Sequence, residues 1–228
     1  MTCKGLIFAA GHASNPHLPL DEVSGLGADL LNTPRIRFPL AVMEKAGVRQ
    51  VIIAAKPEDI AEMHVILGDG RHIGVNVSYL MLECDSSIEL TLSSANRFIA
   101  KSSVLLVSSD VCCTNFQLPD SGSISPQTVL SFRMQNGAVN PQGERPEMLI
   151  IGSSVLNRLR RQTTDLSRGA KDVDQLRRAC MSRFKYQDVD LTQTCTFVNL
   201  KKGITIDNSL MSESAQRSLL SIEPSVAT

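Results

Sequence analysis

The chain has 228 residues, of which 43% are hydrophobic and 20% charged, so it is long enough to bury a substantial core. Its 23 basic and 23 acidic residues give a formal net charge of zero, without a long run of like charge, which argues against a nucleic-acid-binding protein. No apolar run reaches the roughly 18 residues needed to span a bilayer, and the first residues do not form a signal-type segment. We therefore expect a cytoplasmic protein that binds no membrane and no nucleic acid.

The first half of the chain alternates between predicted strands and helices. Short apolar runs bounded by turn residues predict strands at 5–10, 48–55, 75–82 and 104–108. Helical periodicity predicts helices at 34–47, 57–67 and 88–99, with a bend or a late start in the first of them because of Pro39. This order implies right-handed crossovers and an α/β fold, with a mostly parallel central sheet covered by helices on both faces.

The second half is less regular. Its patterns predict strands at 128–134, 148–151, 194–200 and 203–206, and helices at 154–161, 172–183 and 207–220. The long polar segment 11–33 near the start of the chain is expected to be a functional loop.

Two candidate ligand-binding segments follow predicted strands. In open parallel sheets the ligand lies outside the carboxyl ends of the strands, where the strand order reverses. The loop Ala10, Gly11, His12 and Ala13 follows the first strand, and its small residues would let backbone N–H groups approach a phosphate. No G-x-G-x-x-G follows that strand, which argues against a dinucleotide-binding oxidoreductase.

Two aspartates close predicted strands, where a carboxylate suits a hard cation such as Mg²⁺. Asp110 follows the strand at 104–108, and Asp207 follows the strand at 203–206. Each aspartate also has a purely structural explanation, since Asp110 suits a turn and Asp207 suits the N-cap of the last helix. Both alternatives stay open from the residues alone.

Three runs of sequence resemble a known family: FPLAVMEKAGVRQVIIAAKPED, ILGDGRHIGVNVSY and VLLVSSD. They are similar to the sugar-1-phosphate nucleotidyltransferases, above all to the glucose-1-phosphate thymidylyltransferases. The resemblance implies one Rossmann-like nucleotidyltransferase domain over 1–228, with a nucleotide-binding half at 1–117 and a sugar-phosphate and metal half at 118–228.

The resemblance also implies a reaction and its residues. The family transfers a nucleoside monophosphate from a nucleoside triphosphate to a sugar 1-phosphate and releases pyrophosphate. Asp110 and Asp207 match the two aspartates that hold Mg²⁺ in the family, and Asp110 would be catalytic. Similar proteins are commonly homo-oligomers, so we expect one here.

The chain departs from the family pattern where phosphate and base are bound. The family loop G-G-x-G-T-R reads A-G-H-A-S-N here, so its arginine is absent, and a downstream lysine is replaced by the stretch 27–29. The glutamine that reads the base falls on Leu82, and the glycine on which the base lies falls on Ser87. Losing both cations without substitutes would remove roughly 5 kcal/mol of transition-state stabilisation.

Two hypotheses therefore remain. The chain is either an active Mg²⁺-dependent nucleotidyltransferase or a catalytically silent member of the same fold that acts as a ligand-sensing or partner-binding subunit. If it is active, the missing positive charge is to be sought among His12, His17, Arg35 and Arg37.

Overall fold

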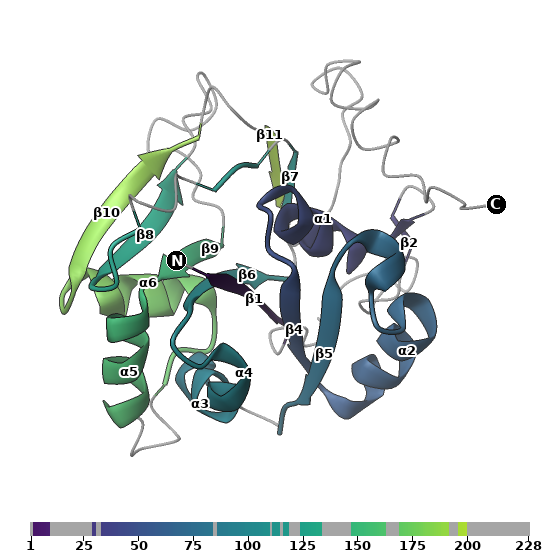
Figure 1. The fold of residues 1–228 in the computed structure, drawn as a ribbon, viewed down its shortest axis with the longest axis horizontal. Coiled ribbons are helices and arrows are strands. Elements are labelled where there is room, and N and C mark those ends of the chain that lie inside the picture. Colours follow the sequence, from purple (N-terminus) through teal and green to yellow (C-terminus); the bar gives the residue numbers. More distant parts are fainter. Residues whose placement is uncertain are drawn as a thin grey trace, which may run out of the picture.

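A seven-stranded sheet forms the centre of the fold (Figure 1). The structure is a computed structural model that describes residues 2–9, 29–30, 33–83, 86–109, 111–114, 116–118, 124–133, 147–162, 169–191 and 196–199. In sheet order the strands are β10 (Lys185–Asp190), β8 (Thr128–Arg133), β9 (Met148–Ile151), β6 (Ser103–Ser108), β1 (Cys3–Phe8), β4 (Gln50–Ala55) and β5 (Asn76–Met81). Only β9 runs antiparallel to its neighbours. The prediction of an α/β fold with a mostly parallel sheet is confirmed.

Helices cover both faces of the sheet, as expected. On one face lie α1 (Arg37–Lys45) and α2 (Pro57–Leu67), and on the other lie α3 (Ile88–Ser94), α4 (Asn96–Ile99), α5 (Ser153–Gln162) and α6 (Val173–Met181). Successive side chains of a strand point to opposite faces, so Ile7 packs in the α1/α2 core, while Leu6 and Phe8 pack in the other. This double burial explains why β1 is apolar at nearly every position. No helix among the described residues is long and apolar enough to cross a membrane.

Most predicted elements are present, with shifted boundaries. The helix expected at 34–47 begins late, at Arg37, so that Pro39 lies in its first turn, where a missing N–H costs no intrahelical hydrogen bond. The helix expected at 88–99 is divided into α3 and α4 at Ala95, whose ψ of 5° lies outside the helical range.

Within the described part of the chain, four strands lie outside the central sheet, in two antiparallel pairs. Strand β2 (Asp29–Leu30) pairs with β3 (Thr33–Pro34), and β7 (Val111–Thr114) pairs with β11 (Thr196–Asn199). Strand β11 lies within the range predicted at 194–200, whereas β7 and β10 were not predicted. The strand predicted at 203–206 and the helix at 207–220 lie outside the described residues.

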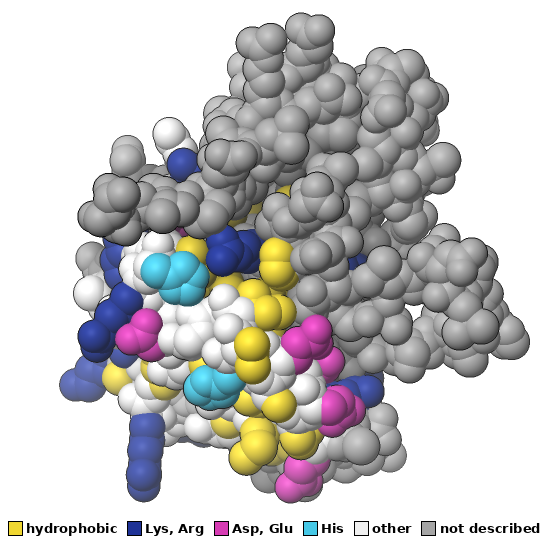
Figure 2. All heavy atoms as spheres, turned by 90° about the vertical axis from the view of Figure 1, so that its right-hand side faces the viewer, with side chains coloured by type: hydrophobic (Ala, Val, Ile, Leu, Met, Phe, Trp, Pro, Cys, Tyr) yellow, Lys and Arg dark blue, Asp and Glu magenta, His cyan; other side chains and the backbone are white. Residues whose placement is uncertain are grey.

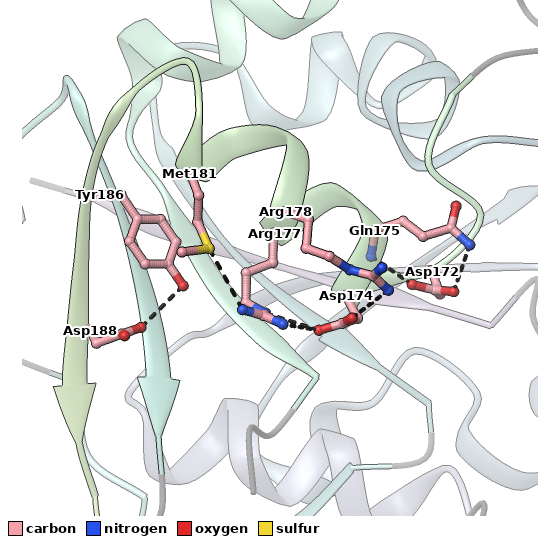
Figure 3. Close-up of polar contacts among 8 residues, drawn as sticks. All are labelled: Asp172, Asp174, Gln175, Arg177, Arg178, Met181, Tyr186 and Asp188. Carbon is pink, nitrogen blue, oxygen red and sulfur yellow. Dashed lines mark hydrogen bonds and ion pairs between the residues drawn. The ribbon is translucent and has the colours of Figure 1, made fainter. Parts of the chain in front are cut away.

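Figure 3 shows polar contacts within α6 and within the neighbouring edge strand β10. The Asp174 carboxylate accepts from the Arg177 guanidinium and contacts Arg178 Nη2 at 2.7 Å. Burial acts to lower the pKa of Arg177, but hydrogen bonds to Asp174 and Tyr186 outweigh it and the pKa is raised. Tyr186 in turn donates to Asp188 Oδ1 at 3.1 Å. A chain of polar groups thus runs from the helix to the outer strand.

Residues 169–170 pack against the first turn of α3 and form two reciprocal hydrogen bonds with it. The Ile88 amide donates to the Ala170 carbonyl and the Ala170 amide donates to Glu89 Oε2, both at 2.8 Å. A Cβ at Gly169 would lie 2.3 Å from Ser87 Oγ and 2.4 Å from Ser87 Cβ, closer than real side chains approach. Glycine at 169 therefore allows the segment before α6 to close onto α3.

The C-cap residues of α2 and α4 have nearly the same backbone conformation, although one is a glycine and the other an alanine. Gly68 has φ 53° and ψ −125°, and Ala100 has φ 51° and ψ −121°. Glycine adopts this region freely, whereas a Cβ makes it strained by about 1–3 kcal/mol. We predict that Ala100→Gly raises the free energy of unfolding by about 1 kcal/mol, after the entropic cost of glycine in the unfolded chain, and that Gly68→Ala lowers it. Urea denaturation checks this, and a less stable Ala100→Gly variant would contradict it.

The contact at Gly169 predicts a second, coupled pair of stability changes. Gly169→Ala should lower the free energy of unfolding by about 2 kcal/mol, because its methyl group overpacks against Ser87. Ser87→Gly alone should cost only a few tenths of a kcal/mol, since glycine is a tolerated N-cap residue. The double variant should be more stable than Gly169→Ala in the same urea titration. Strict additivity of the two changes would show that the Ser87 contact is not the cause.

Candidate functional site

The strand order reverses between β1 and β6, at the middle of the sheet. From β1 the chain moves outward to β4 and β5, and then returns to form β6 on the other side of β1. Phe8 lies beside Ser108, and the Ser109 amide donates to the Phe8 carbonyl at 3.1 Å. The chain therefore leaves β1 after Ala9, and leaves β6 after Ser109, at adjacent points of the carboxyl edge. Ligands of open α/β sheets bind at such a reversal.

The pair β7 and β11 lies directly beyond this edge. Val111, which follows Asp110, is paired with Asn199 at the end of β11. Asp207 follows Asn199 by eight positions, a span of chain long enough to turn back toward Val111. The pairing thus places β11, the described strand that precedes Asp207 in the sequence, next to Val111, which directly follows Asp110.

The predicted site residues themselves lie outside the described residues. These are Ala10, Gly11, His12, Ala13, Asp110 and Asp207, and with them His17. Their roles stay predictions. Among the residues that the structure does describe, no group of three or more His, Cys, Asp or Glu side chains is arranged to hold a metal ion.

Other charged residues at the carboxyl edge were not predicted from the sequence. Lys56 directly follows β4, and Glu147 precedes β9, where its carbonyl accepts from the Ser108 amide at 3.0 Å. Arg133 ends β8, and its Nη2 lies 3.9 Å from Asp190 Oδ2. The sequence signal for these residues is their position at strand ends. The last residues of the parallel strands and the first residue of the antiparallel strand β9 all lie at the same edge of the sheet.

Arg37 differs from an arginine on a solvated helix face. It opens α1, which packs against β1 and β7, and it is half-buried. Its Nε is buried and meets no hydrogen-bond acceptor within the described part of the chain. Buried N–H groups normally have partners, so this guanidinium is suited to an anionic ligand. Arg35, the other candidate from this segment, is also half-buried.

The two positions that match the base-binding residues of the family are filled by packing. Leu82 is 6% exposed and belongs to the core beneath α3. Ser87 is fully buried, and its Oγ accepts from the Leu90 amide at 3.2 Å as the N-cap of α3. Gly169 closes over it. Neither side chain presents a polar group to a nucleotide base.

Comparisons with known proteins agree with this architecture. No protein-family model matches the chain. Over 107 residues, or 47% of its length, the chain is 30% identical to the glucose-1-phosphate thymidylyltransferase of Neisseria meningitidis and 29% identical to that of Mycobacterium tuberculosis. The match spans only 37% of the length of each of these relatives.

Solved structures match almost the whole chain. A Bacillus anthracis protein described as a glucose-1-phosphate thymidylyltransferase, in complex with sucrose, has a TM-score of 0.69 at 14% identity, with 94% of this chain and 96% of that one covered. The inositol-1-phosphate CTP transferase of T. maritima has 0.64 at 12% identity, with 100% and 99% covered. A Mycobacterium tuberculosis protein in complex with manganese has 0.54 at 16% identity, with 98% and 100% covered. The chain thus has the fold of the sugar nucleotidyltransferases and is similar in sequence to the glucose-1-phosphate thymidylyltransferases among them.

Proposed function

We propose that the chain is a sugar-phosphate nucleotidyltransferase that binds a nucleoside triphosphate in the crevice between β1 and β6. The observation that carries the proposal is the reversal of strand order there, with Ala9 and Ser109 leaving the sheet at adjacent points. The backbone of Ala10–Ala13 would bind the phosphates, and Asp110 would lie across from it. The similarity to thymidylyltransferases supports a sugar 1-phosphate as the acceptor.

The reaction needs placement of charged groups more than covalent chemistry. An oxygen of the acceptor phosphate would attack the α-phosphorus in line as the bond between that phosphorus and the leaving pyrophosphate breaks. One P–O bond replaces another, so catalysis depends on orientation and on offsetting negative charge. Arg37, whose buried Nε meets no acceptor among the described residues and whose helix packs against β1, is suited to replace the arginine missing from the loop.

The proposed cofactor is Mg²⁺, held by the carboxylates of Asp110 and Asp207. Carboxylate oxygens are the ligands that Mg²⁺ prefers, and the pairing of Asn199 with Val111 supports the approach of the two aspartates. Mg²⁺ bound there would offset the charge of the triphosphate. Mg²⁺ usually takes only one or two carboxylates beside phosphate oxygens and water, so two aspartates suffice.

The second candidate is a catalytically silent subunit that senses a ligand or binds a partner. The burial of Leu82 and Ser87 favours it, because the base would find apolar packing where the family offers a glutamine and a glycine. Under this hypothesis the crevice binds a phosphate-bearing ligand without transferring it.

Calorimetric titration of the full chain with Mg²⁺ and each common nucleoside triphosphate tests both candidates. We predict Mg²⁺-dependent binding of at least one triphosphate, and Asp110→Asn should weaken it at least about tenfold by removing a metal ligand. Glu62→Gln, which removes an exposed carboxylate from α2, is the matched control and should bind as the unaltered chain does.

An assay of pyrophosphate release with a panel of sugar 1-phosphates then separates the two candidates. Release that depends on both substrates supports transfer. Binding without release supports the silent subunit. If no triphosphate gives any heat, the transferase proposal fails. If Asp110→Asn binds the triphosphate as the unaltered chain does, Asp110 is not a metal ligand and its role is that of a turn residue.

A further inference from the structure

The two outer strands of the sheet differ in their protection against pairing. Strand β10 reads KYQDVD and carries Lys185, Asp188 and Asp190, whereas β5 reads NVSYLM and carries no charged residue. Proteins commonly guard an edge strand with charges, prolines or bulges, because its unpaired backbone groups are a template for another strand. Of the two edges, β5 is the unguarded one.

The open part of β5 is defined by its hydrogen bonds. The Asn76 amide donates to the Arg49 carbonyl at 2.7 Å and the Leu82 amide to the Ala55 carbonyl at 2.8 Å, so even-numbered residues face β4. Odd-numbered residues face outward, and the first of them, Val77, already donates to the Asp69 carbonyl at 2.8 Å. Tyr79 and Met81 are left, and within the described chain no strand pairs with their outward backbone groups.

The side chains along this edge are apolar and accessible. Met81 is 69% exposed, and Tyr79 and Leu80 are half-buried. Tyr79 is fixed by its hydroxyl, which donates to the Gly68 carbonyl at 2.7 Å. Figure 2 faces the side of the molecule on which α2 and β5 lie, and it shows hydrophobic side chains on that side with acidic side chains beside them. An incoming strand would gain both backbone hydrogen bonds and apolar contacts.

We propose that a second copy of this chain pairs with β5 through its own β5, antiparallel, about a two-fold axis at Leu80. In this register Tyr79 lies opposite the partner subunit's Met81, and both residues have outward-facing N–H and C=O groups. Each such pair exchanges two hydrogen bonds, and the two-fold axis repeats the pair. The two Leu80 residues meet at the non-hydrogen-bonded centre, where Cα atoms lie about 4.5 Å apart.

Charges beyond the two ends of the open edge are complementary in this arrangement. Exposed Glu83 follows β5, and in this register it lies opposite the partner subunit's Val77. Val77 is bonded to the Asp69 carbonyl, two positions before Arg71, whose side chain is 80% exposed. The contact with Asp69 occupies Arg71 Nε at 3.2 Å and leaves the other guanidinium donors for a carboxylate. Asp69 and Arg71 form an ion pair, so this end of the edge is not cationic overall. The antiparallel register brings the Glu83 carboxylate toward the guanidinium donors of the partner subunit's Arg71 that Asp69 does not occupy.

The mass of the full chain in solution is the first test. Light scattering after size exclusion at micromolar concentration should give twice the chain mass of 24.8 kDa. Met81→Lys should weaken the association at least about tenfold by placing a charge on the paired edge. Met181→Lys makes the same change at a residue that is 46% exposed on α6, next to β10 at the opposite end of the sheet, and should leave the mass unchanged. A monomeric unaltered chain, or a Met81→Lys variant that associates as before, overturns the proposal.

Disulfide cross-linking tests the register itself. Leu80→Cys should cross-link two subunits under mild oxidation, because the expected Cα separation is within the range of disulfides. Ser78→Cys is the matched control on the same strand and face; its partner in this register is Leu82, so it should cross-link no more than the unaltered chain. Circular dichroism first confirms that Leu80→Cys, at a half-buried position, is folded. Equal cross-linking at positions 78 and 80 contradicts this register, and the Met81→Lys result stands as an independent test.

Discussion

The packing of β1 between β4 and β6 is the constraint on which the rest of the structure depends. The strand is hydrogen-bonded on both edges and covered on both faces, so its sequence has little freedom. Gly5 shows this most clearly, since a Cβ there would lie 2.8 Å from Met43 Sδ and 3.1 Å from Val51 Cγ2. Because Gly5 has no Cβ, α1 can lie close to the strand. The position of α1 in turn sets where Arg37 starts the helix and where the chain must return from the first loop.

Buried elements could be predicted from the sequence, because burial on both faces leaves an apolar run that few other structures produce. Strands β1, β4 and β6 are of this kind. Helix α2 was predicted instead from its apolar periodicity and from Pro57 and Gly68 at its ends. Strand β10 was missed because it packs at an edge, where only Tyr186 and Val189 of its six residues are half-buried. Its stability comes from pairing with β8 and from contacts with α6, neither of which is visible in a window of local sequence.

The location of the candidate site could be predicted from the sequence because it follows from the order of the strands in the sheet. The alternation of strands and helices predicted a reversal of strand order, and the sheet places it between β1 and β6. Lys56, Arg133 and Glu147 were not predicted, because a charged residue at either end of a strand is common and only the shared edge of the sheet distinguishes these three. The burial of Arg37 was not predictable either, since a solvated helix start and a half-buried one can have the same sequence.

The filled positions Leu82 and Ser87 bear on selectivity more directly than on catalysis. Bonds form and break at the α-phosphorus, whereas contacts to the base are the same in the ground state and in the transition state. Interactions of that uniform kind strengthen binding without accelerating the chemical step. Losing them would lower the affinity for the triphosphate and the discrimination between bases, whereas the proposed phosphate loop and metal site would determine the rate of the proposed reaction. The departures at Leu82 and Ser87 therefore favour a silent protein only through weak and unselective base binding. The stronger argument for it is the missing loop arginine, and that argument depends on whether Arg37 replaces the arginine.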